Sequence, residues 1–222
     1  MSSFYIRREI VTPCRDGSEK SMTHKGLLIG FMAKKRAGKD TSADYLCVKH
    51  GFVKQSFAAP LKKACGAMFN FTQQQIERDY FKEKVDPTWG ITPRQAFQFV
   101  GTELIRAHMD ELISGVGAGF WIRNMQQRID NLRKENPEVN IVISDVRFQN
   151  EVDMIHELGG KVIKIERDTV ATRNKAGKHK KKQDTHASEM DMDSIDNYDA
   201  FITNDGTKED LYKNIEISIS SI

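Results

Sequence analysis

The stretch LLIGFMAKKRAGKDTSADYL, residues 27–46, decides the fold. It opens in an apolar run of strand character over residues 26–31 and passes through a basic turn that carries a glycine. It then continues in a helical pattern over residues 41–49, which Gly51 is placed to end. Strand, glycine-bearing loop and helix follow one another in the order that a phosphate-binding loop requires.

The loop itself departs twice from the pattern G-x-x-x-x-G-K-[ST]. Ala33 stands where the pattern has its first glycine, and Asp40 follows the lysine, with Thr41 one position later. Gly38 would let the backbone approach a phosphate, at a helix N-terminus whose partial positive charge favours an anion. Lys39 would reach the outer phosphates of a nucleotide. The alternative is a basic surface turn before an ordinary helix, with three further cations on it: Lys34, Lys35 and Arg36.

Length and composition indicate one soluble globular domain with room for a small insertion. The chain has 222 residues, of which 39% are hydrophobic and 29% charged. No apolar run approaches the roughly 18–20 residues that span a bilayer, and the first 25 residues lack the pattern of a secretory signal. Three widely spaced cysteines predict reduced thiols and a cytoplasmic setting. The net charge of +3 suits a protein that handles small anions but does not by itself imply nucleic acid.

The rest of the chain alternates between strand and helix patterns. We expect strands at residues 51–58, 140–146, 161–166 and 199–205, and helices at 60–70, 92–112, 120–136, 147–160 and 207–219. In the helix at 92–112, Thr92 is the expected cap and Pro93 fits the first position. One face of that helix would carry Phe97, Val100, Leu104 and Ile105. Such an alternation predicts an α/β fold, with a parallel sheet covered on both faces by helices.

The stretch IVISDVR, residues 141–147, is the second chemical motif. It is an apolar strand that ends in Asp145, and ligands of open α/β sheets bind at the carboxyl ends of the strands. Asp145 could act on a magnesium shell or on a substrate hydroxyl, and Arg147 could pair with a phosphate in bidentate fashion. The alternative is a helix cap at Asp145 and a surface arginine.

Two segments near the C-terminus carry weaker signals. The stretch DTHASE, residues 184–189, places His, Ser and Glu together, but the G-x-S-x-G elbow of a serine hydrolase is absent. The run RNKAGKHKKKQ, residues 173–183, is either part of a lid over a phosphate site or a solvated loop.

Taken in order, these motifs resemble those of the phage-type deoxynucleoside monophosphate kinases. The resemblance rests on AKKRAGKDTSADYL, AAPLKKA, QFVGTELIR followed by an F-W pair, ISDVRFQNEVDMIHELGGKVIKIER, DTHASE and FITNDGTKEDLY, and it runs from about residue 26 to about residue 212. It implies a single P-loop kinase domain. The core would span about 25–58 and 138–222, with a helical acceptor-binding insertion at about 59–137 and a lid at about 167–190.

The resemblance also accounts for the unusual loop. Monophosphate kinases such as adenylate kinase carry G-K-G-T, and Gly38, Lys39, Asp40 and Thr41 fit that spacing. Thr41 would then supply the phosphate-binding hydroxyl, and Asp40 would face magnesium-bound water. Ala33 remains a departure, for which we expect a slightly different start of the loop and no loss of the site.

Carried over position by position, the resemblance implies two sets of ligands. The set for ATP is Arg36, Gly38, Lys39, Asp40 and Thr41. The set for the acceptor monophosphate is Lys35, Lys62, Arg94, Gly101, Thr102, Trp121, Asp145, Arg147 and Asn150. Lys39, Arg147 and Asp145 would serve catalysis. For Trp121 the alternative is an ordinary core tryptophan.

The resemblance implies transfer of the γ-phosphoryl group of ATP to a deoxynucleoside monophosphate (dNMP), with Mg²⁺, giving ADP and a deoxynucleoside diphosphate. The partners would be these small molecules, with no stable nucleic acid and no membrane. The resemblance also favours a homodimer. The protein would be located in the cytoplasm, which would be the host cytoplasm if the chain comes from a phage. One alternative is another small-molecule P-loop kinase, such as a dephospho-coenzyme A kinase. A second is a nucleic-acid-binding module that uses the run KHKKK.

Overall fold

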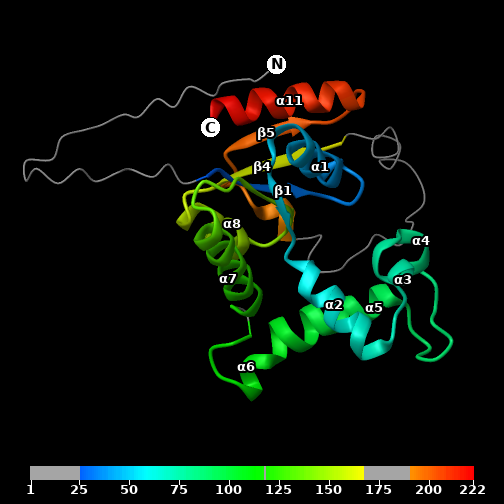
Figure 1. Cartoon of the computed structure of the whole chain (residues 1–222). Coiled ribbons are helices and arrows are strands. Elements are labelled where there is room, and N and C mark those ends of the chain that lie inside the picture. Colours follow the sequence, from blue (N-terminus) through cyan, green and yellow to red (C-terminus); the bar gives the residue numbers. More distant parts are fainter. Residues whose placement is uncertain (1–25, 118, 168–190) are drawn as a thin grey trace, which may run out of the picture.

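The computed structural model describes residues 26–117, 119–167 and 191–222 (Figure 1). The N-terminal segment, the basic run at 173–183, the stretch DTHASE and all of the expected lid except Arg167 lie outside the described residues.

In the described part of the chain, five parallel strands form a central sheet in the order β2-β3-β1-β4-β5. Their bounds are β1 Leu28–Ala33, β2 Val53–Gln55, β3 Ile141–Val146, β4 Lys161–Glu166 and β5 Ala200–Thr203. β1 is central and buried along its whole length. Met32 pairs with Val146 and Ala33 with Ile165, so the carboxyl ends of the three middle strands lie level with one another. The parallel α/β sheet predicted from the sequence is confirmed.

Helices cover both faces of the sheet (Figure 1). On one face α1 (Lys39–His50) and α11 (Lys208–Ser221) pack against Ile29 and Phe31 of β1. On the other face α7 (Phe120–Glu135) and α8 (Gln149–Glu157) pack against Leu28 and Met32. Successive residues of a strand point to opposite faces, so one buried strand serves two separate cores. Gly51 ends α1 as expected, with φ 68°.

A short 3-10 helix, η3 (Asp191–Ser194), precedes β5. The other helices form an insertion that projects away from the sheet (Figure 1). They are α2 (Ala58–Phe69), α3 (Gln73–Glu77), α4 (Asp79–Lys82), α5 (Pro93–Gln98), the π-helix η1 (Phe99–His108) and α6 (Met109–Leu112). Among the described residues, no helix combines the length and the apolar composition needed to cross a bilayer.

The helix expected at 92–112 begins as predicted but changes type. The Thr92 hydroxyl accepts a hydrogen bond from the Gln95 amide at 3.1 Å, and Pro93 occupies the first turn. From Phe99 onward the helix is a π-helix, whose i→i+5 hydrogen bonds widen each turn. Val100 and Ile105, five residues apart, therefore both turn inward, whereas Leu104 is 37% exposed. The predicted apolar face was wrong at Leu104 because it assumed an α-helical turn.

Helix α7, which the boundary drawn from the resemblance includes in the insertion, packs against the sheet. The buried residues of α7, among them Met125 and Ile129, share a core cluster with strands β1 and β3. Helices α3 and α4 occupy a polar stretch in which the sequence pattern predicts no helix, and the side chain of Thr72 caps α3.

Candidate active site

The phosphate-loop candidate connects β1 to α1 at the carboxyl edge of the sheet. Arg36 and Gly38 adopt left-handed backbone angles, with φ of 67° and 107°. A Cβ on residue 38 would lie 2.5 Å from Nδ2 of Asn204, so both the backbone angle and the space require glycine there. Ala33 is the buried last residue of β1 and needs no positive φ. The departure from the usual first glycine is therefore compatible with this loop.

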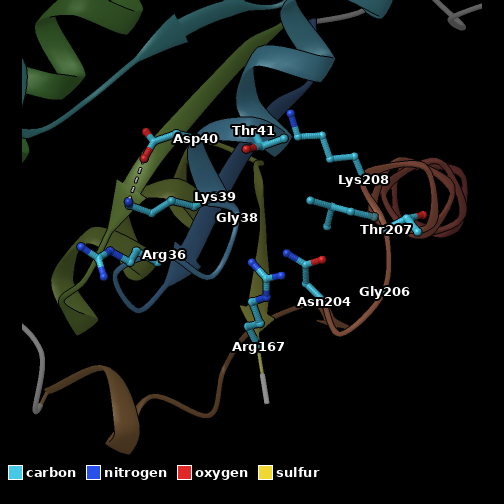
Figure 2. Close-up of a pocket in the computed structure, with 11 residues that line it drawn as sticks. Arg36, Gly38, Lys39, Asp40, Thr41, Arg167, Asn204, Gly206, Thr207 and Lys208 are labelled. Carbon is cyan, nitrogen blue, oxygen red and sulfur yellow. Dashed lines mark hydrogen bonds and ion pairs between the residues drawn. The ribbon is translucent and has the colours of Figure 1, made fainter. Parts of the chain in front are cut away.

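All five residues expected to hold ATP line one cavity of about 230 Å³. Figure 2 shows Arg36 and the Lys39–Asp40 pair on one side of the loop and the β5–α11 segment on the other. Among the described residues, the lining is Arg36, Gly38, Lys39, Asp40, Thr41, Arg167, Asn204, Gly206, Thr207, Lys208 and Leu211. Cationic side chains and helix-terminal amides around a hollow of this kind suit a polyphosphate.

Asp40 remains ionised beside the loop lysine. The Lys39 ammonium donates a hydrogen bond to Oδ2 of Asp40 at 2.9 Å, and Lys54 lies 3.7 Å from Oδ1. Burial raises the pKa of Asp40, but the charge and hydrogen bond of Lys39 and the charge of Lys54 outweigh it and hold the pKa below its ordinary value. The Asp40 carboxylate and the Thr41 hydroxyl, from consecutive residues that line the cavity, are hard oxygen ligands of the kind that Mg²⁺ takes together with nucleotide phosphates. Within the described ranges, no cluster of three or more His, Cys, Asp or Glu side chains forms a metal site by protein ligands alone.

Asn204 and Arg167 also line the cavity, although the sequence analysis named neither as a ligand; Arg167 is the first residue of the expected lid. Asn204 is buried directly after β5 and donates from Nδ2 to the carbonyl of Ala37 at 2.9 Å. Its own amide donates to the Glu166 carbonyl at 2.7 Å, which ties the loop to β4 and β5. Arg167 follows β4 and lies beside Asn204 in Figure 2. The available signal was their position directly after a strand, at the edge where ligands bind.

Asp145 is the next-to-last residue of β3 and caps a helix of the insertion. Its carboxylate accepts hydrogen bonds from the Ser56 hydroxyl at 2.6 Å and from the amides of Phe57 and Ala58 at 2.8 and 3.0 Å. These donors surround the N-terminus of α2, where a negative charge is favourable. Asp145 therefore caps α2, and its contacts fix the start of the insertion relative to the sheet.

The segment after Asp145 is held by a buried carboxylate that the sequence reasoning also missed. Glu151 accepts from the Arg147 amide at 2.8 Å and pairs with the Arg106 guanidinium of η1 at 3.0 Å. Burial raises the pKa of Glu151 to about 7, and the charge of Arg106 offsets only part of that cost. Arg106 also stacks over the Phe148 ring at 3.7 Å and donates to Oδ1 of Asn150 at 3.4 Å.

Two of the cations expected to bind the acceptor converge on one carboxylate. Oε1 of Glu83 lies 3.2 Å from Nζ of Lys35 and 2.5 Å from Nε of Arg94. Asp79 pairs with the same two cations at 4.0 and 3.5 Å. Lys62 of α2 lies within electrostatic range of Asp40. The structure thus brings these three cations to the side of the loop that faces the insertion.

Gly101, Thr102 and Trp121 lie where η1 meets its neighbours. A Cβ on Gly101 would lie 2.5 Å from Cδ2 of Leu61, so glycine lets α2 and η1 pack closely. Trp121 is buried in the core and donates from Nε1 to the Gly101 carbonyl at 3.0 Å. Thr102 is half-buried on η1. The observed contacts of Trp121 match the core alternative, and its link to the site runs through Gly101.

Solved structures show a general likeness to small-molecule kinases. The dephospho-CoA kinase from Campylobacter jejuni aligns with a TM-score of 0.49 and 16% identity, covering 88% of this chain and 98% of that one. A thymidylate kinase from Candida albicans aligns with a TM-score of 0.43 and 12% identity, covering 89% and 92%. Likeness at this level carries no inference about substrate.

Sequence comparison is more specific. The family model of deoxynucleotide monophosphate kinase matches residues 67–215. A protein of Acanthamoeba polyphaga mimivirus, provisionally named a deoxynucleotide monophosphate kinase, is 41% identical over 191 residues, covering 85% of this chain and 94% of the relative. The deoxynucleotide monophosphate kinase of Enterobacteria phage T4 is 22% identical over 255 aligned residues, covering 85% and 97%.

Proposed function

The chain belongs to the deoxynucleotide monophosphate kinase family, and from this premise we propose that it transfers the γ-phosphoryl group of ATP to a dNMP. The products are ADP and a deoxynucleoside diphosphate. One observation carries the assignment of the donor site: the five residues expected to hold ATP line a single cavity at the carboxyl edge of the sheet. The family match, made on sequence alone, is independent of that geometry.

The donor phosphates bind in the loop between β1 and α1. The amides at the start of α1 and the Lys39 ammonium hold the outer phosphates, and the Thr41 hydroxyl contacts them from the first turn. Asp40 and Thr41 fit a magnesium shell shared with the nucleotide, and Mg²⁺ when bound neutralises charge on the β- and γ-phosphates. Phosphoryl transfer needs little covalent chemistry from the protein, so the loop acts by positioning and by charge.

The acceptor binds on the opposite side of Lys39, between the loop and the insertion. The positive charges of Lys35, Lys62 and Arg94 bind its phosphate, and Arg147, which follows β3, also binds that phosphate. Support for this side comes from the convergence of Lys35 and Arg94 on Glu83, because two cations from separate elements meet there. Gly101 and Thr102 border the same region from η1.

We assign Asp145 a positioning role and no general base. Its oxygens already accept three hydrogen bonds from the start of α2. A phosphate monoester has a second pKa near about 6, so its attacking oxygen is mostly ionised at pH 7 and needs no base. In this assignment the insertion runs from α2 to α6, and α7 belongs to the core, as its packing against the sheet supports.

An ADP-release assay over a panel of acceptors tests the proposal. The panel contains the dNMPs, the corresponding ribonucleotides and dephospho-coenzyme A, with DNA binding measured in parallel at several salt concentrations. We expect ADP release with at least one dNMP and only weak DNA binding. Turnover with dephospho-coenzyme A alone would replace the proposed acceptor, and tight, salt-sensitive DNA binding without turnover would remove the kinase assignment. Sedimentation of the same preparation tests the homodimer that the family resemblance favours.

A further inference from the structure

We propose that Glu83 is a positioning residue, which holds Lys35 and Arg94 in place for the phosphate group of the acceptor. The proposal rests on the proposed function and adds a residue to it that neither the motifs nor the comparisons identify. Glu83 lies in the polar stretch between α4 and α5, from which the sequence predicts no chemistry.

A single carboxylate oxygen bridges two cations from distant parts of the chain. Oε1 of Glu83 is 3.2 Å from Nζ of Lys35, which lies on the phosphate loop, and 2.5 Å from Nε of Arg94, on α5. Lys35 and Glu83 are 48 residues apart in sequence, so the contact joins the insertion to the loop of the core. Without a shared anion, two cations in this position would repel each other.

Glu83 binds Arg94 in a way that allows the two terminal nitrogens of the guanidinium to contact a ligand. Glu83 takes Nε, and a guanidinium can still present its two terminal nitrogens as a planar fork to a phosphate. Nη2 of Arg94 has Asp79 near it only at 3.5 Å. A carboxylate that orients an arginine from Nε and a phosphate that binds its fork can therefore be accommodated together.

The local charge also fits a phosphate monoester. Lys35, Lys82 and Arg94 each lie within 4.0 Å of Asp79 or Glu83, and Lys62 lies within electrostatic range of Lys82. The three cations paired with these two carboxylates leave one positive charge, and Lys62 is shared between this cluster and Asp40. The phosphate of a nucleoside monophosphate carries about −1.5 to −2 at pH 7, so it suits a cluster with an excess of positive charge.

Asp79 provides a matched comparison. It is 52% exposed, as Glu83 is, and lies at the other end of the same short helix. It pairs with the same two cations, but at 4.0 and 3.5 Å. If only the overall negative charge mattered, removing either carboxylate would have the same effect. If the short contacts of Glu83 matter, its removal alone should impair the acceptor phosphate site.

The test compares the full-length variants Glu83→Ala, Glu83→Gln and Asp79→Ala with the wild type. We expect Glu83→Ala to raise the KM for the dNMP by about 10-fold to 100-fold, the scale of losing one charge-assisted contact, while the KM for ATP stays within about twofold. Glu83→Gln should recover part of the loss, because its oxygen still accepts hydrogen bonds. Asp79→Ala should change the KM for the dNMP by less than about threefold.

Inhibition by the matching deoxynucleoside, which lacks the phosphate, separates positioning from general damage to the pocket. Its inhibition constant should be the same in Glu83→Ala and the wild type. Tighter dNMP binding in Glu83→Ala would mean that Glu83 competes with the phosphate, and equal losses in Asp79→Ala or with the deoxynucleoside would mean a charge or folding effect. Each of these results overturns the proposal. Failure of the proposed function would appear separately, as no dNMP-dependent ADP release by the wild type, and calorimetric binding of dNMP would then compare the same variants.

Discussion

At the scale of single residues, Lys39 is the lysine of the phosphate loop and lines the proposed donor cavity. It is the first residue of α1 and pairs with Asp40 at 2.9 Å. Its charge should count most in the transition state, where negative charge develops on the transferred group. We therefore expect Lys39→Met to lower kcat by at least about a hundredfold. Near-normal turnover in a variant whose circular dichroism is unchanged would remove the phosphate-loop assignment.

Arg147 tests whether the two nucleotide sites are assigned the right way round. A lysine ammonium is a point charge and cannot reproduce the planar fork of a guanidinium. Arg147→Lys should weaken dNMP binding by about tenfold and leave ATP binding largely unchanged, as titration calorimetry of each nucleotide would measure. Weakened ATP binding with normal dNMP binding would exchange the two assignments.

A site residue can be predicted from the sequence when its partners lie close to it along the chain, and it is missed when they lie far away. Lys39 and Thr41 belong to a local pattern that has a meaning by itself. Asn204 bonds to Ala37, 167 positions away, and Glu83 bonds to Lys35 across 48 positions. Such partners become visible only after the chain has folded. This explains why the cavity residues predicted from the loop were found together, whereas the supporting residues around them were missed.

At the scale of elements, the core strands and helices follow from periodicity, but η1 does not. Amphipathic patterns assume 3.6 residues per turn, and nothing in the stretch FVGTELIRAH signals i→i+5 hydrogen bonding. The short helices α3 and α4 likewise depend on capping and on ion pairs made by the folded chain. Of the insertion, only its helical character and the Thr92 cap could be predicted.

The close packing of α2 on η1 makes a prediction about Gly101. A methyl group there would meet Leu61 at 2.5 Å, so Gly101→Ala should destabilise the fold by about 1–2 kcal/mol in spite of the better helix propensity of alanine. In a Leu61→Ala background the same substitution should be neutral or stabilising, because the clash is gone. Urea unfolding of the two single variants and the double variant measures this coupling. Purely additive effects would show that the contact does not limit packing.

The ion pair between η1 and α8 predicts a pH-dependent stability. Burial raises the pKa of Glu151 to about 7, from an ordinary value of 4.5. Between these values the folded protein holds a proton that the unfolded chain has released, so this group's contribution to stability is complete below pH 4.5. It is lost as pH rises through 7, by up to about 3 kcal/mol at about 1.4 kcal/mol per pH unit.

The variant Glu151→Gln lacks this titration. Its free energy of unfolding, relative to that of the wild type, should therefore rise between pH 5 and pH 8, whatever its absolute stability at pH 5. Unfolding in urea at matched ionic strength measures the difference. A difference that stays constant with pH would mean that Arg106 keeps Glu151 ionised throughout this range.

At the scale of the whole molecule, the proposed donor and acceptor sites lie on opposite sides of the loop at the end of β1. The donor cavity lies towards β4, β5 and α11, and the acceptor cations lie towards the insertion. The parallel sheet predicted from the alternation of strands and helices brings the ends of β1, β3 and β4 to one edge, which is why motifs far apart in sequence can act together. The position of the insertion relative to that edge depends on contacts such as the cap that Asp145 provides for α2. No local sequence pattern predicts such contacts.

In the proposed mechanism no side chain acts as a base, and the attacking anion is the ionised phosphate oxygen of the acceptor itself. The rate of the chemical step should fall below about pH 6, as the acceptor phosphate takes up a proton. This fall in rate is the acidic limb of the pH–rate profile. In single-turnover measurements with a thiophosphate acceptor, whose corresponding pKa is lower, the limb should lie at lower pH. Asp145→Asn should lower the rate through the loss of its cap on α2, but the limb should stay where it is in the wild type.

The opposite pattern would require a side-chain base. If the limb is unmoved by the thiophosphate acceptor and shifts in Asp145→Asn, the carboxylate takes part in proton transfer in spite of its three hydrogen bonds to the start of α2. Turnover with an unphosphorylated deoxynucleoside would point the same way, because a neutral hydroxyl must lose its proton to attack. Circular dichroism of Asp145→Asn distinguishes either result from a loss of fold.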